Sequence, residues 1–73
     1  MNEIVKAALT PAQLRVAEAL LDGLGNREIA ARIGVTERNV KARLQLLFLK
    51  FQVVPLGEER EKRILLARKL LCV

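Results

Sequence analysis

Two helix-forming stretches joined by a short turn with one glycine constrain the fold of this chain more than any other feature of its sequence. Residues 26–33 form a short stretch, and a longer basic stretch follows Thr36. Gly34 between them can adopt the positive φ that ends a helix abruptly, and the Thr36 hydroxyl can cap the next helix. This arrangement is typical of a helix-turn-helix, whose second helix can enter the major groove of DNA. We therefore expect the functional side chains to lie after Thr36.

Length and composition predict a single all-α domain that spans residues 1–73. A chain of 73 residues has the size of one small domain, and its two aromatic residues are Phe48 and Phe51. Of all residues 52% are hydrophobic, and because so few of these are aromatic, the core must consist mostly of Leu, Ile, Val and Ala. Such a core, without Trp or Tyr, favours helices over strands.

The residue types that many enzymes and metal sites need are scarce. The sequence has no histidine and one cysteine, Cys72, which excludes a metal-ligand cluster, a disulfide framework and a Cys/His catalytic pair. We expect no catalytic residue, metal or cofactor, and we interpret Cys72 as an apolar filler rather than a reactive thiol. Residues 1–9 are too short and mixed for a signal peptide, and no apolar run reaches about 18 residues. These features predict a cytoplasmic protein without membrane association.

Helix start and stop signals predict four helices. Thr10, Pro11 and Gln13 form the pattern of a capping box with proline at the first helical position. Asn26 has a side chain that commonly caps helices, so we expect it to cap the second helix. The four helices are expected to begin at Thr10, Asn26, Thr36 and about residue 58 and to end near residues 22, 33, 51 and 72, with the helix-turn-helix core at 26–52.

The positive charge of the chain is concentrated on the predicted helix-turn-helix. There are 13 Lys and Arg residues against 8 Asp and Glu residues, a net charge of +5. Residues 27–50 hold six basic and two acidic side chains, and six minus two leaves +4. A basic surface on one structural unit is expected of a protein that lies against phosphates. Solubility alone is the alternative explanation.

At 100° per residue, the third predicted helix has one apolar and one polar face. The apolar face, expected to be buried, holds Val40, Leu44, Leu47, Phe48 and Phe51. Lysine can donate to guanine, glutamine can pair with adenine, and an alanine methyl can touch thymine. The side chains expected to reach base edges from the polar face are Arg38, Lys41, Ala42 and Gln45. Arg43 at the flank is better placed for a phosphate, and the alternative for all of them is an ordinary solvated face.

One buried face cannot accommodate all the remaining apolar residues. Leu46 and Leu49 continue the exposed side of the third predicted helix. The last predicted helix has apolar residues on nearly all sides. Its residues Glu59 and Arg63 are spaced for an i,i+4 ion pair. A helix with more than one apolar face is either central or shared, and its terminal position favours a two-fold dimer over simple burial. The expected dimer or partner interface comprises Leu46, Leu49, Ile64, Ala67 and Leu71.

Four segments carry a likeness to a known family, namely Leu9-Thr10-Pro11, Gly23-Leu24-Gly25-Asn26-Arg27-Glu28-Ile29-Ala30, Ile33-Gly34-Val35-Thr36-Glu37 and Val40-Lys41. They resemble the LuxR/GerE-type helix-turn-helix domain of bacterial transcription regulators over residues 9 to about 53. The resemblance implies a four-helix fold, a third helix that enters the major groove and dimerisation through the fourth helix. It places the recognition residues at Lys41, Ala42 and Gln45 and the phosphate contacts at Asn26, Arg27, Thr36 and Arg43.

Two functional classes remain open. The first is a stand-alone dimeric regulator that binds double-stranded DNA at a roughly palindromic operator. We expect it to stand alone because the chain begins with methionine and holds no receiver or ligand-binding domain. The second is a protein-interaction module that keeps the fold but pairs with another regulator or with RNA polymerase. The segment Lys41-Ala42-Arg43-Leu44 also resembles region 4 of sigma factors, although the longer connection at 54–57 and the extra helix after it fit that family poorly.

Overall fold

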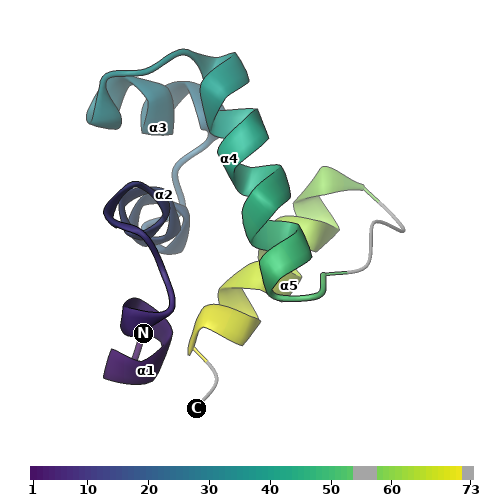
Figure 1. Ribbon diagram of the computed structural model, residues 1–73. Helices are drawn as coiled ribbons and strands as arrows, with labels where there is room; N and C mark the ends of the chain where they lie inside the picture. The colour runs from purple at the N-terminus through teal and green to yellow at the C-terminus, as the bar shows by residue number, and fades with distance from the viewer. Residues whose placement is uncertain (54–57, 72–73) are drawn as a thin grey trace.

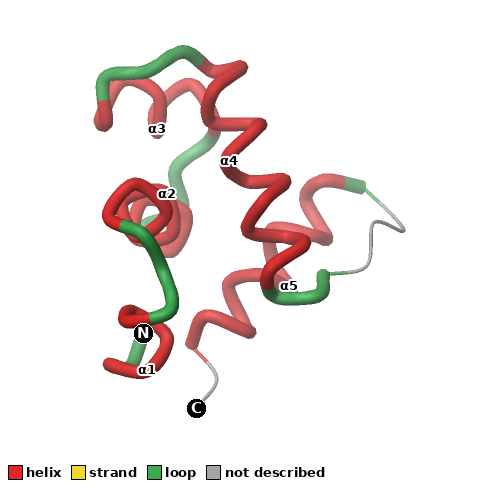
Figure 2. Tube along the Cα trace, viewed as in Figure 1, coloured by secondary structure: helices red, strands yellow, loops and turns green. Residues whose placement is uncertain are grey.

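The computed structural model describes residues 1–53 and 58–71, and these residues form five α-helices and no strand (Figures 1 and 2). The expected all-α fold is confirmed. The expected connection at 54–57 and the expected helix end at Cys72 lie outside the described residues. In chain order the helices are α1 (Glu3–Ala7), α2 (Pro11–Leu21), α3 (Asn26–Ile33), α4 (Glu37–Lys50) and α5 (Glu59–Leu71).

The expectation of four helices was wrong by one, because a short helix, α1, precedes the other four. The Asn2 side-chain oxygen accepts a hydrogen bond from the Val5 amide at 2.8 Å and caps α1. Met1 and Val5 pack against the core, whereas Ile4 is 79% exposed. A helix of five residues is too short to display an apolar period, so the sequence pattern did not reveal it.

The predicted capping box at the start of α2 is confirmed. The Thr10 hydroxyl accepts from the Gln13 amide at 3.2 Å, and the Gln13 side-chain oxygen accepts from the Thr10 amide at 3.0 Å. Two backbone donors that the helix leaves unpaired are thereby satisfied. This reciprocal pair fixes where α2 begins and therefore which of its side chains face α4.

The turn between α3 and α4 forms as the sequence predicts. Gly34 has φ +75° and ends α3, and the Val35 amide donates to the Ala30 carbonyl at 3.0 Å. Thr36 then caps α4 by accepting from the Asn39 amide at 3.1 Å. The chain therefore changes direction within a few residues, and α4 begins at a defined position (Figure 1).

Replacing Gly34 with alanine is expected to lower the free energy of unfolding by about 1 to 2 kcal/mol, the usual cost of a left-handed conformation. A Cβ atom at this position meets nothing within 4 Å, so the cost comes from the backbone conformation alone. Chemical denaturation followed by circular dichroism measures the change. Gly34→Asn is the matched control, because asparagine tolerates positive φ and should cost less. Equal costs for both variants would contradict this explanation.

The predicted cap of α3 was wrong. The cap position is Gly25, and no side chain caps the helix. Asn26 is already the first helical residue, and its side-chain oxygen instead accepts from Arg63 of α5 at 2.6 Å. The expected ion pair between Glu59 and Arg63 does not form, because the Arg63 guanidinium donates to Asn26 and Leu24 instead.

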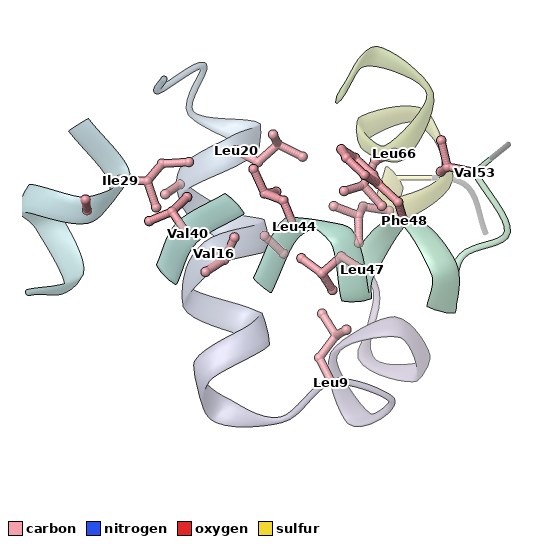
Figure 3. Packing of buried hydrophobic residues seen from close by; sticks show 14 residues of the cluster. Leu9, Val16, Leu20, Ile29, Val40, Leu44, Leu47, Phe48, Val53 and Leu66 are labelled. Carbon is pink, nitrogen blue, oxygen red and sulfur yellow. The ribbon is translucent and has the colours of Figure 1, made fainter. Parts of the chain in front are cut away.

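One apolar cluster holds α2, α3, α4 and α5 together (Figure 3). In Figure 1, α4 runs beside α2, with α3 near one end of α4 and α5 near the other. The predicted buried face of α4 is confirmed, with Phe51 only half-buried at its end. The buried residues are Leu9, Val16, Ala17, Ala19, Leu20, Ile29, Ala30, Val40, Leu44, Leu47, Phe48, Val53, Leu66 and Leu70.

Candidate nucleic-acid interface

The side chains expected to contact bases share one exposed face of α4. At 100° per residue they fall within an arc of about 100°, which does not overlap the arc of the buried face. The α4 residues that face the core are anchored, so this orientation is fixed by packing rather than by the polar residues themselves. The structure thus brings together the four residues Arg38, Lys41, Ala42 and Gln45, all of them exposed.

Three basic side chains near the turn are exposed and available. Arg27 lies in the first turn of α3, and Arg38 and Lys41 lie in the first two turns of α4. Within residues 1–53 and 58–71, none of the three makes an ion pair or a side-chain hydrogen bond. Their charges are therefore not neutralised by the described part of the chain, and an anion can approach them.

Other basic residues of the helix-turn-helix hold the scaffold together. Arg32 pairs with Asp22 at 2.7 Å and joins α3 to the end of α2. Lys50 donates to the Ala8 carbonyl, and its Nζ also lies 3.4 Å from the Gln13 side-chain oxygen. Some basic residues of the helix-turn-helix therefore make contacts within the protein, and others are exposed without a partner among the described residues.

Arg43 and Thr36, two of the expected phosphate contacts, already have partners inside the chain. Arg43 is half-buried and its Nε donates to the Asn39 side-chain oxygen. Thr36 is exposed, and its hydroxyl accepts the capping hydrogen bond. Arg43 also lines a hollow of about 100 Å³ together with Arg15 of α2, and no acidic residue lines it. Arg15 was not predicted from the sequence as part of this site, because nothing local to α2 indicates that it lies near Arg43 of α4.

The residues expected to form an interface lie at more than one place. Ile64 and Ala67 of α5 line a hollow of about 500 Å³ beside the turn between α2 and α3. Leu71, at the end of α5, is 59% exposed. Leu46 and Leu49 are 57% and 71% exposed on α4, outside that hollow. The structure therefore brings Ile64 and Ala67 together and leaves the two leucines of α4 apart from them.

The sequence matches the family model described as bacterial regulatory proteins, luxR family, over residues 7–56 of the 73-residue chain. The matched span covers well over half of the chain. The protein belongs to the LuxR family. It thus contains a LuxR-type helix-turn-helix, a DNA-binding domain of transcription regulators, and the predicted resemblance is confirmed. Comparison with curated proteins and with solved structures gave no match.

The span matched by the LuxR-family model includes the elements that carry the candidate interface. Residues 7–56 include α2, α3 and α4, whereas α5 follows the matched span. Among the described residues, no helix combines the length and the apolar character needed to cross a membrane. Within the same residues, no three or more His, Cys, Asp or Glu side chains gather where they could hold a metal ion.

Proposed function

We propose that this LuxR-family protein is a homodimeric transcription regulator that reads double-stranded DNA with α4 in the major groove of each half-site. The observation that carries the proposal is the exposed face of α4, which presents polar side chains directly after a tightly fixed turn. A helix held by its buried face can enter a groove without rearranging, and the residues near its N-terminus then reach base edges. Residues 1–73 act as one such domain, which meets its DNA in the cytoplasm.

Each residue of this face has a distinct proposed role. Lys41 and Arg38 donate to guanine acceptors, and Gln45 pairs with adenine. Ala42 contacts a thymine methyl group. These pairings follow from the donor and acceptor groups that each base pair presents in the major groove. Together they define the base-reading surface, formed by Arg38, Lys41, Ala42 and Gln45.

The proposed phosphate contacts lie on both sides of the base-reading surface. Arg27 is exposed at the start of α3, where no side chain caps the helix and the free backbone amides favour an anion. Thr36 and Arg43 lie near the start of α4. Asn26 lies beside Arg27 and is the fourth residue of the set. Such contacts position a protein on the duplex without reading its sequence.

The proposed dimer uses one side of α5. Ile64, Ala67 and Leu71 are spaced by three and four residues and therefore lie on the same side of that helix. The Cα atoms of the protein span 30 × 28 × 18 Å. Half-sites one DNA turn apart lie about 34 to 36 Å from each other on the same face of the duplex, a distance comparable to the longest extent of one subunit. A two-fold dimer of this size therefore suits half-sites on the same face of the duplex.

Binding to a mixed-sequence duplex across a salt series tests the proposal. Fluorescence anisotropy should give a Kd of about 10⁻⁴ to 10⁻⁶ M near physiological salt, and the affinity should fall steeply between roughly 50 and 200 mM salt. The fall reflects the release of counterions when Arg and Lys side chains neutralise phosphates. An absence of binding at the lowest salt concentration would overturn the proposed function.

Lys41→Ala is expected to weaken binding to a duplex selected by the wild-type protein by about 1 to 3 kcal/mol, the scale of a base contact. Lys41 is exposed, so the variant should remain folded. Lys6→Ala on α1 is the matched control, because it removes the same charge from the protein and should leave the preference for the selected duplex unchanged. Equal losses in the two variants would remove Lys41 from the base-reading surface.

The exposure of Leu46 and Leu49 favours a second candidate function. These side chains continue the outer side of α4 beyond Gln45, and exposed leucines add nothing to phosphate binding. In this alternative the fold is a protein-interaction module that pairs with another regulator or with RNA polymerase. It predicts no salt-dependent DNA binding, so the same anisotropy series distinguishes it from the first proposal.

A further inference from the structure

The Arg63 guanidinium of α5 donates two hydrogen bonds to the segment between α2 and α3. Its Nη1 donates to the Asn26 side-chain oxygen at 2.6 Å, and its Nη2 donates to the Leu24 carbonyl. Both Arg63 and Asn26 are half-buried. The two acceptors lie 37 and 39 residues away in the sequence. One planar guanidinium therefore ties the last helix to the first residue of α3.

This contact determines which end of the Asn26 carboxamide is free. A guanidinium has only donors, so the atom that meets it must be the amide oxygen and not the amide nitrogen. The Nδ2 group, with two hydrogens to donate, must then point away from Arg63. Within residues 1–53 and 58–71, Nδ2 donates no hydrogen bond, whereas Oδ1 is occupied. Asn26 thus presents donors at the uncapped start of α3.

We propose that Arg63 is a positioning residue that orients Asn26 so that its Nδ2 group donates to a DNA phosphate. The inference rests on the proposed function and assigns Arg63 a role through Asn26 rather than a contact with DNA. The start of α3 adds to the site because its backbone amides have no side-chain cap and Arg27 stands beside them. Phosphate oxygens accept hydrogen bonds only, so they suit this set of donors.

The same contact connects the proposed dimer helix to the proposed phosphate site. α5 packs on the core through Leu66 and Leu70, which are apolar contacts without strong directionality. The two hydrogen bonds donated by the Arg63 guanidinium add directional contacts to the segment between α2 and α3. The position of the α3 start relative to α5 is thereby fixed, and with it the place of the Asn26 side chain.

Asn26→Asp tests the proposal, because it keeps the acceptor oxygen of the side chain and removes the amide donors. The substitution should leave the fold intact. Aspartate keeps the oxygen that Arg63 binds and adds charge to that hydrogen bond, so thermal stability should be unchanged or higher. It also removes the Nδ2 donors and faces the phosphate with a negative charge, so DNA affinity should fall at least about tenfold. A variant that binds the mixed-sequence duplex within twofold of the wild type would overturn the proposal.

Variants of Arg63 then distinguish positioning from direct contact. Arg63→Met should weaken DNA binding about as much as Asn26→Ala, because methionine has no hydrogen to donate to the Asn26 side-chain oxygen. The double variant Asn26→Ala/Arg63→Met should bind no more weakly than the single variants. The salt dependence should keep its slope in Arg63→Met, measured at a temperature where circular dichroism reports a folded protein.

Each contrary result has a definite meaning. Additive losses in the double variant would overturn the proposed action through Asn26. A slope lower by about one in Arg63→Met would show that Arg63 itself neutralises a phosphate, and would also overturn it. If the wild-type protein shows no salt-dependent binding, the proposed function fails together with this inference. If the wild type binds and Asn26→Asp binds equally well, only the inference fails.

Discussion

Replacing Leu44 with alanine is expected to lower the free energy of unfolding by about 2 to 5 kcal/mol. Leu44 is fully buried in the middle of α4, and Figure 3 shows it at the centre of the cluster, between Leu20 and Val16 of α2 and Leu47. Truncation removes apolar contacts with more than one helix and leaves a cavity that rigid helix packing cannot close. The loss therefore combines a transfer cost with a cavity cost.

The effect is large because the domain is small. A chain of 73 residues has a total stability of roughly 4 to 11 kcal/mol, so this one substitution removes a large part of it and should lower Tm by roughly 10 to 30 °C. Circular dichroism is the suitable probe, since the chain has no Trp or Tyr. Leu65→Ala is the matched control, because Leu65 is 41% exposed and should cost about 1 kcal/mol or less. Similar losses in both variants would show that Leu44 is not central to the fold.

The parts of the fold that could be predicted from the sequence are those encoded by neighbouring residues. Thr10 and Thr36 cap helices within three residues of themselves, and Gly34 ends one by its own backbone conformation. The buried face of α4 follows from a period that four turns of helix display clearly. Each of these features depends on a short segment, so the sequence alone contains the information that determines it.

Features that depend on distant residues could not be predicted in this way. The sequence suggested that Asn26 caps α3 and that Arg63 pairs with Glu59, because both interpretations use only local spacing. In the structure the two residues bond to each other across 37 positions. A contact of this kind follows from the packing of α5 against the turn, which no periodicity in the sequence reveals.

At the candidate site, too, the sequence predicts the number of basic residues in the helix-turn-helix but not which of them have partners within the protein. Counting residues predicts a basic surface, and the exposed Arg27, Arg38 and Lys41 agree with that expectation. The count does not show that Arg32 is neutralised by Asp22 or that Lys50 holds the start of α2. The tertiary fold decides which side chains keep all their donors open to a phosphate, and only three of the six basic residues in 27–50 have no partner in the described chain.

Replacing Leu71 with glutamate is expected to convert the proposed homodimer into a monomer and to weaken binding to a two-half-site duplex by about 10² to 10⁴-fold. Leu71 is 59% exposed at the end of α5, on the same side as Ile64 and Ala67. A two-fold axis would bring two glutamates into one apolar interface, where desolvation and repulsion oppose association. A monomer then binds each half-site alone and loses the gain in effective concentration.

Leu65→Glu provides the matched control, because it introduces the same charge into the same helix at a position about 100° away from Ile64. Light scattering should report a dimer for the wild type and for Leu65→Glu and a monomer for Leu71→Glu, and anisotropy with the selected duplex should follow the same order. The comparison separates a specific interface from a general effect of negative charge near DNA, since both glutamates repel phosphates. If Leu65→Glu dissociates the dimer and Leu71→Glu does not, the interface lies on the other side of α5, and if neither does, α5 does not form it.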